Sequence, residues 1–341
     1  MNRIPLNFLK YTGFLLLGLV ILWWVTRSQD LDLILLEVKK ANYSWLLLAM
    51  MIGVLSHFIR ALRWNILIGS VGSKVSTGKI FHAVMTGYLI NLLVPRLGEI
   101  SRCMMLSKST GLPFNNLAGT MVAERIIDLI TLAFLLIITI AVQFHFIVGF
   151  INDLILRPLL EQNSDAFALF LTGFVGLAVL LTIFAIWVRR KLKIARPGSF
   201  KHKVKEQLRG FLLGLKSIWK MRQKGLFIFH SIIIWALYFL TAYLAFFAIE
   251  ATSHLSPMAG ITLLAVGSLG ILAPVPAGIG TYHFMTISTL TMLYKITPEP
   301  ATSYAYLSHA MQVLLILGTN GVLWLIFTFR WKRLFKVKTS Q

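Results

Sequence analysis

Long runs of apolar residues, separated by short polar segments, extend through most of the chain. A helix needs roughly 20 apolar residues to cross a hydrocarbon core of about 30 Å. Six runs have this length, and we expect each to be a transmembrane helix. They cover residues 8–26, 45–66, 117–143, 167–188, 226–249 and 304–329. The pattern predicts an all-α polytopic membrane protein with a single membrane domain over residues 1–341.

Two other apolar stretches are too short or too broken to cross. Residues 80–94 end at Pro95 after about 22 Å of helix. Residues 257–294 contain two apolar arms, separated by the proline and glycine segment APVPAGIGTYH. Basic residues flank the first stretch and acidic residues flank the second. We therefore expect two re-entrant helical hairpins, at 80–107 and 257–294, that enter the membrane from opposite faces.

The order of these elements suggests an internal repeat. Residues 1–145 and residues 167–329 would each contain three spans and one hairpin, and Pro276 lies 181 residues after Pro95. Because three is an odd number, the second half would be inverted relative to the first, as in many secondary transporters. The alternative is a pair of unrelated kinked helices.

Composition and charge agree with a membrane protein. The 341 residues are 57% hydrophobic and 13% charged, against about 25% charged in soluble domains. The net charge of +21 would suggest nucleic acid, but the cations gather at residues 189–224 and in the C-terminal tail. Eight of the twelve acids fall on the opposite face. The positive-inside rule thus predicts cytoplasmic termini, and this clustering argues against a nucleic-acid partner. We expect the membrane to be a bacterial inner membrane.

Apolar residues recur at helical spacing within the basic segment 189–224. We expect an amphipathic helix on the cytoplasmic surface that orients the protein. The alternative function for this helix is recruitment of anionic lipid.

A few charged residues fall inside apolar segments, where each costs at least a few kcal/mol and needs a partner. Such residues often mark a substrate pathway. They are Arg60 and Arg63 in RALRW, Arg96, Glu99 and Arg102 at the first helix break, and Glu124, Arg125 and Asp128 in VAERIID. Two structural alternatives remain open. Arg60 and Arg63 could extend to the headgroups, and Arg125–Asp128 or Arg96–Glu99 could be pairs that only fix packing.

The second helix break adds polar groups. We expect Gly278 and Gly280 to offer backbone N–H groups there, with Tyr282 and His283 nearby. Together with the arginines they would form a cationic site near the midplane, suited to a phosphate. The chain has one cysteine and no pair of histidines at metal-ligand spacing, so we expect neither a metal nor a cofactor.

Three motifs resemble the lysylphosphatidylglycerol synthase transmembrane-region family, also called flippase-like domain proteins. The family pattern Pro-x-x-Gly-Glu-x-x-Arg falls on Pro95, Gly98, Glu99 and Arg102, and Glu-Arg-x-x-Asp falls on VAERIID. In the late Pro-x-Pro-Gly-Gly-x-Gly segment, Ala277 replaces a glycine, and His283 stands where many relatives have Glu. The resemblance implies a lipid translocase. Because the chain ends at Gln341, we expect the membrane module without a synthase domain.

The resulting hypothesis is a non-enzymatic lipid flippase. Its substrate would be an anionic, phosphate-bearing membrane lipid: a phospholipid, an aminoacyl-phospholipid or a polyprenyl-phosphate-linked lipid. Arg96, Arg102 and Arg125 would bind the headgroup, Arg60 and Arg63 would guide entry, and the three acids Glu99, Glu124 and Asp128 would orient the arginines.

Two other hypotheses remain. The chain could be an integral-membrane glycosyl- or phosphotransferase acting on a lipid-linked sugar, with Asp30 and Asp32 as catalytic acids. Those acids could instead cap an external amphipathic helix. The third possibility is a membrane scaffold that transports nothing.

Overall fold

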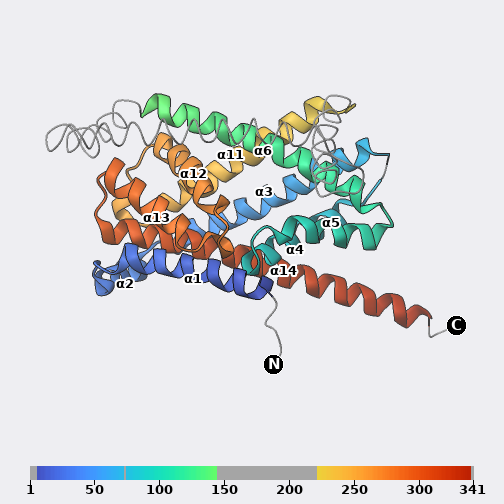
Figure 1. The fold of residues 1–341 in the computed structure, drawn as a ribbon, viewed down its shortest axis with the longest axis horizontal. Coiled ribbons are helices and arrows are strands. Elements are labelled where there is room, and N and C mark those ends of the chain that lie inside the picture. Colours follow the sequence, from blue (N-terminus) through green and yellow to red (C-terminus); the bar gives the residue numbers. More distant parts are fainter. Residues whose placement is uncertain (1–5, 73, 144–220, 339–341) are drawn as a thin grey trace. The chain divides into compact units, whose positions relative to one another are not determined.

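A computed structural model describes residues 6–72, 74–143 and 221–338, and every regular element in these ranges is a helix (Figure 1). The chain divides into two compact units, residues 1–136 with 217–341 and residues 137–216. The fold and the site below belong to the first unit. The predicted span 167–188 and almost all of the basic segment 189–224 lie outside the described residues.

Five of the six predicted spans coincide with helices. Four described helices are long and apolar enough to cross a membrane, and α1 with α2 adds a fifth if this pair, bent by 95°, counts as one span. The bend lies at residues 27–30, between α1 and the short amphipathic helix α2. The helices that match predicted spans are α1 (Leu6–Thr26), α3 (Tyr43–Ser70), α6 (Phe114–Val142), α11 (Lys224–Leu244) and α14 (Pro298–Lys338).

The outer faces of these helices carry large exposed apolar side chains, such as Val20 on α1 and Phe134 on α6. Soluble monomers rarely expose so much apolar surface, whereas helices in lipid do so normally. The chain is therefore a polytopic membrane protein.

Helix α14 is longer than the sequence suggested. Its apolar run ends near residue 329, where we expected the helix to stop, yet the helix continues to Lys338. The residues beyond the run are mainly Arg, Lys and Leu, which are good helix formers. Loss of hydrophobicity therefore ends the membrane span but not the helix.

Both predicted hairpins are pairs of packed helices. The first joins α4 (Thr77–Leu93) to α5 (Leu97–Thr110) through three residues. The second joins α12 (Pro257–Leu272) to α13 (Thr281–Ser288) through a short 3₁₀ turn at Pro276–Gly278. In Figure 1, α4 and α5 lie side by side, which agrees with their contacts. Entry of the hairpins from opposite membrane faces stays a prediction.

The two helix breaks share a backbone geometry. At each break a proline is followed by a residue in the left-handed region, Arg96 with φ 64° and Ala277 with φ 54°. These positions are 181 residues apart, the same separation as the two prolines. The conformation costs a non-glycine residue roughly 1–2 kcal/mol, so tertiary contacts must hold both turns.

Close helix packing fixes the first hairpin. The N–H of Gly98, in the first turn of α5, donates to Asn91 Oδ1 on α4 at 2.7 Å. Gly98 also packs directly on the backbone of Gly87. An apolar core lies beside this contact and includes Trp64, Val84 and Leu106. The absence of a side chain at residue 98 thus sets the distance between α4 and α5.

The short helix α2 (Leu31–Lys40) begins at a carboxylate cap. Asp30 accepts hydrogen bonds from the amides of Asp32 at 2.9 Å and Leu33 at 3.2 Å. This is the capped helix that the sequence suggested for these acids, because a side-chain acceptor satisfies the free amides of a first turn.

The substitution Gly98→Ala should destabilise the hairpin. The new Cβ would lie 2.7 Å from the Asn91 side chain and would collide with the Gly87 carbonyl. We expect the free energy of unfolding in detergent to fall by about 1–3 kcal/mol. Gly119→Ala is the control, because a Cβ there meets nothing within 4 Å. Equal stability of the two variants would contradict this account of the packing.

Candidate functional site

Two long helices place charged side chains opposite each other. Arg60 and Arg63 are three residues apart on α3, and Glu124 and Asp128 are four residues apart on α6, so each pair shares a helix face. Asp128 accepts from Arg60 Nη2 at 2.6 Å and from Arg63 Nη2 at 2.7 Å. The two helices are therefore joined by ion pairs in the middle of an apolar region.

Glu124 is the centre of these ion pairs. It is 0% exposed and three guanidinium groups face it. The nitrogen to oxygen distances are 2.6 Å from Arg60, 3.4 Å from Arg63 and 3.2 Å from Arg102. Because Arg102 lies on α5, this one carboxylate ties the first hairpin to α3 and α6.

Arg60 and Arg63 are almost fully engaged. Arg60 Nη1 donates to the hydroxyls of Tyr88 at 2.5 Å and Tyr238 at 3.1 Å, and Arg63 Nη1 donates to Ser231 Oγ at 3.1 Å. Both arginines are buried. Protein groups surround both side chains, so in this conformation they are not placed to guide a lipid into the site.

Arg102 differs from these two arginines. Its guanidinium lies over the Trp64 ring, 4.5 Å from the centroid, and its Nη2 faces Glu124 without the alignment of a hydrogen bond. Its Nε and Nη2 are buried and have no hydrogen-bond partner. A buried charged group with unused donors is costly. Arg102 thus retains hydrogen-bonding capacity, although its charge is paired with that of Glu124.

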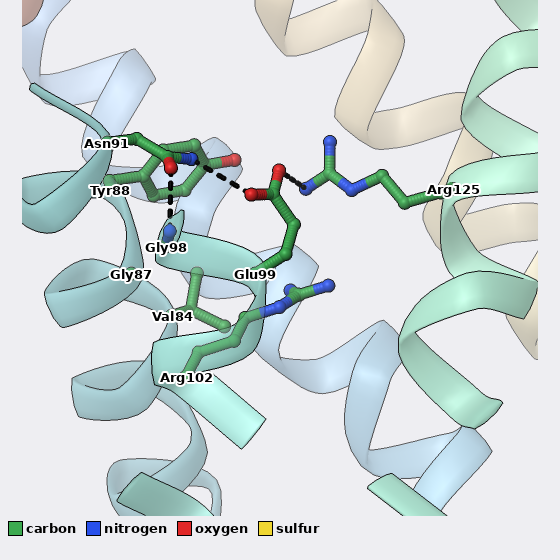
Figure 2. A pocket seen from close by; sticks show the side chains of 8 residues that line it. All are labelled: Val84, Gly87, Tyr88, Asn91, Gly98, Glu99, Arg102 and Arg125. Carbon is green, nitrogen blue, oxygen red and sulfur yellow. Dashed lines mark hydrogen bonds and ion pairs between the residues drawn. The ribbon is translucent and has the colours of Figure 1, made fainter. Parts of the chain in front are cut away.

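An acceptor for Arg102 has a place to enter. Figure 2 shows a small pocket that is lined by residues of α4, α5 and α6. Its empty volume, including the open solvent at its mouth, is about 200 Å³. On its wall, Glu99 Oε1 lies 4.0 Å from Arg125 Nη2, and Asn91 Nδ2 donates to Glu99 Oε2 at 3.4 Å. The lining residues are Val84, Gly87, Tyr88, Asn91, Gly98, Glu99, Arg102 and Arg125.

The pairing of charges differs from the alternatives that the sequence left open. Arg125 reaches Glu99 on α5, whereas Asp128 pairs with the two arginines of α3. Adjacent helix positions point in different directions, so Arg125 leaves the face shared by Glu124 and Asp128. Sequence spacing within one motif could not identify partners on other helices.

Arg96 lies apart from the ion pairs. It is exposed, and its Nη2 donates to the carbonyl of Leu272 at the end of α12, at 3.2 Å. A cation at a helix C-terminus is favourable. Arg96 therefore links the two hairpins through one of its five N–H donors.

The predicted residues of the second hairpin form a separate polar group. The Gly278 amide donates to the Val275 carbonyl within the turn, so it is not free for a ligand. Gly280 packs on the backbone of Gly18 in α1. The Tyr282 hydroxyl lies 2.9 Å from Ser308 Oγ, and the His283 ring lies 4.7 Å from that of His309. The structure does not bring these side chains into the ion pairs with Glu124.

Sequence reasoning missed several polar and aromatic residues of the site. Asn91 carried a signal, since it is an amide in the apolar run before Pro95. Tyr88 and Trp64 lie in otherwise ordinary apolar helices, and Tyr238 is 178 residues from Arg60 in the sequence. Only the fold brings these side chains to the arginines.

The site suits an anion better than a metal. Among the described residues, no group of three or more His, Cys, Asp or Glu side chains is arranged to hold a metal ion. Guanidinium groups instead bind phosphate oxygens through strong, charge-assisted hydrogen bonds. The pocket therefore has the charge to attract a small anionic group toward Arg102, while its enclosed space in this conformation is no larger than a water molecule needs.

Comparison with known proteins identifies related chains. The model of a family described as the lysylphosphatidylglycerol synthase TM region matches residues 12–318. A UPF0104 membrane protein of Pyrococcus horikoshii is 24% identical, covering 77% of this chain and 80% of its own. Another, from Methanocaldococcus jannaschii, is 24% identical over 92% of this chain and 94% of its own.

A further relative is the glycosyltransferase AglD of Haloferax volcanii. It is 23% identical, and the match covers 91% of this chain but 53% of that protein. No solved structure matches the chain significantly.

The substitution Glu124→Gln should strongly reduce stability. It leaves Arg102 without an acidic partner and Arg60 and Arg63 with Asp128 alone, and breaking a buried ion pair costs about 3–5 kcal/mol. Arg125→Gln is the comparison, because its half-exposed pair with Glu99 is worth less than about 1 kcal/mol. Chemical unfolding in detergent measures both. Similar losses in the two variants would show that Glu124 does not hold these helices together.

Proposed function

Because the chain belongs to the lysylphosphatidylglycerol synthase transmembrane-region family, we propose that it moves an anionic, phosphate-bearing lipid between the leaflets of a membrane. The observation that carries this proposal is the pocket wall formed by Arg102, a buried guanidinium with unused donors. Glu124 balances the charge of Arg102, but the Nε and Nη2 of Arg102 lack hydrogen-bond acceptors, and buried unused donors are unfavourable. A phosphate would satisfy them.

The structure suggests different roles for the five arginines. Arg102 and Arg125 line the pocket and would contact the headgroup. Arg60 and Arg63 would position Glu124 and Asp128 and act through them rather than on the lipid. Arg96, which donates one hydrogen bond to the Leu272 carbonyl, would contact the headgroup through its other donors.

The hairpins would act as opposed gates in an inverted repeat. Two observations support this arrangement: both turns place a left-handed residue after proline, at a separation of 181 residues, and Arg96 connects the two hairpins. The basic segment 189–224 and the basic tail support a topology with both termini in the cytoplasm, under the positive-inside rule. Since the relatives named above are archaeal, the expected bacterial inner membrane broadens to a prokaryotic cytoplasmic membrane.

A glycosyltransferase is the second candidate, favoured by the name of one relative. That match covers about half of the relative, and here Asp30 already serves as a helix cap. Metal-dependent transfer of a sugar that is lost in Asp32→Ala would favour the enzyme over the translocase.

Transport by the reconstituted protein tests the proposal. Fluorescent phosphatidylglycerol in the inner leaflet is protected from an external quencher until it moves to the outer leaflet. Its fluorescence should therefore decay faster in proteoliposomes than in protein-free liposomes. Arg125→Ala should slow this rate about tenfold or more, since a hydrogen bond to a charged group is lost. Lys108→Ala is the matched control, because this exposed cation lies on α5 outside the pocket.

Two outcomes would contradict the proposal. One is wild-type protein that moves neither labelled phosphatidylglycerol nor a labelled polyprenyl phosphate. The other is Arg125→Ala protein that transports at the wild-type rate.

A further inference from the structure

The charged residues around Glu124 contain one more cation than anion. Three arginines (Arg60, Arg63 and Arg102) face two acids (Glu124 and Asp128). The neighbouring Arg125–Glu99 pair adds one charge of each sign. The acids count as ionised, because each lies within 4.0 Å of a guanidinium group. The seven residues together carry a surplus of one positive charge.

The surplus positive charge can be assigned to one side chain. Arg60 and Arg63 each donate a hydrogen bond to Asp128 and others to neutral hydroxyl groups. Arg102 Nε and Nη2 have no hydrogen-bond partner, as is also true of Arg63 Nε, although Arg102 is only 3% exposed. The one acidic partner of Arg102, Glu124, is shared with Arg60 and Arg63, so the positive charge is least balanced at the arginine that lines the pocket.

A carboxylate shares this pocket. Glu99 lines it together with Arg102 and is held by Asn91 and by its pair with Arg125. Any anion that binds Arg102 also lies near the negative charge of Glu99 (Figure 2). One negative charge on the ligand neutralises the surplus, whereas a second would have no partner and would be repelled by Glu99.

We infer that the pocket selects a headgroup with a single negative charge, a phosphodiester, and that Glu99 sets this limit. The inference rests on the proposed function and narrows its substrate. A phosphodiester carries one charge, whether it belongs to a phospholipid or to a polyprenyl monophosphate bonded to a sugar. A phosphate monoester carries about 1.5 to 2 negative charges near pH 7, and a diphosphate also exceeds one. The pocket therefore favours diesters over monoesters and diphosphates.

Binding to the purified full-length protein in detergent tests this selectivity without requiring transport. Calorimetry at pH 7.5 compares dioctanoyl phosphatidylglycerol, a diester, with dioctanoyl phosphatidic acid, a monoester with the same chains. We expect the diester to bind at least about tenfold more tightly. Glycerophosphoglycerol, the same diester without acyl chains, should bind more weakly than the lipid.

Two substitutions that change the charge of the pocket should alter the ratio of diester affinity to monoester affinity. Glu99→Gln keeps the size of the side chain but raises the surplus to two, so the preference for the diester should fall to about equality or reverse. Arg102→Gln removes the surplus, so binding of both lipids should weaken about tenfold or more. Lys108→Gln removes a positive charge from the same helix outside the pocket and should leave the ratio unchanged. Unfolding temperatures verify that each variant is folded.

The outcomes separate this inference from the proposed function. Equal affinity of the wild-type protein for the two lipids, or an unchanged ratio in folded Glu99→Gln, overturns the charge limit. Selective diester binding without lipid movement in proteoliposomes supports the charge limit and overturns the translocase. If glycerophosphoglycerol binds as tightly as the lipid, the acyl chains contribute nothing to binding. That result overturns the conclusion that the ligand is a lipid.

Discussion

The centre of this protein depends on one carboxylate that is removed from solvent and faced by three guanidinium groups. Burying an acid costs several kcal/mol unless cations replace its hydration. The replacing cations come from α3 and α5, and the acid comes from α6, so its neutralisation requires all three segments to be in place. The same requirement brings Arg102 to the pocket, because its guanidinium is held between Glu124 and the Trp64 ring.

Much of the fold follows from properties that act along the chain. Apolar runs give the helices of the described spans, and Pro95 and Pro276 fall inside apolar stretches, where proline breaks a helix, so both hairpins were predictable. The charged residues of the site were also conspicuous, because charges within apolar segments are rare. Their partners were not predictable, since the pairing of Arg125 with Glu99 depends on how α5 and α6 are placed. Tyr238 shows the same limit: an aromatic residue in an apolar helix reveals no partner until the fold positions it.

The two helix breaks show how local strain and tertiary contact support each other. Arg96 adopts a backbone conformation that glycine would adopt at no cost, yet the position holds an arginine. Its side chain contacts the last carbonyl of α12, a contact that glycine could not make. Strained residues of this kind cluster at clamps and switches. The first turn is thus a contact point between the hairpins as well as a bend in the chain.

The contact between Gly18 and Gly280 has a mechanical consequence. Backbone touches backbone there, so no flexible side chain can absorb a displacement of one segment against the other. Trp24 and Phe284 add a second contact between α1 and α13, with ring centroids 6.2 Å apart. The second hairpin and the first helix therefore form one stiff body. Helix α1 runs over residues 6–18 before it reaches this contact, so a displacement of α1 would also move the turn containing Ala277.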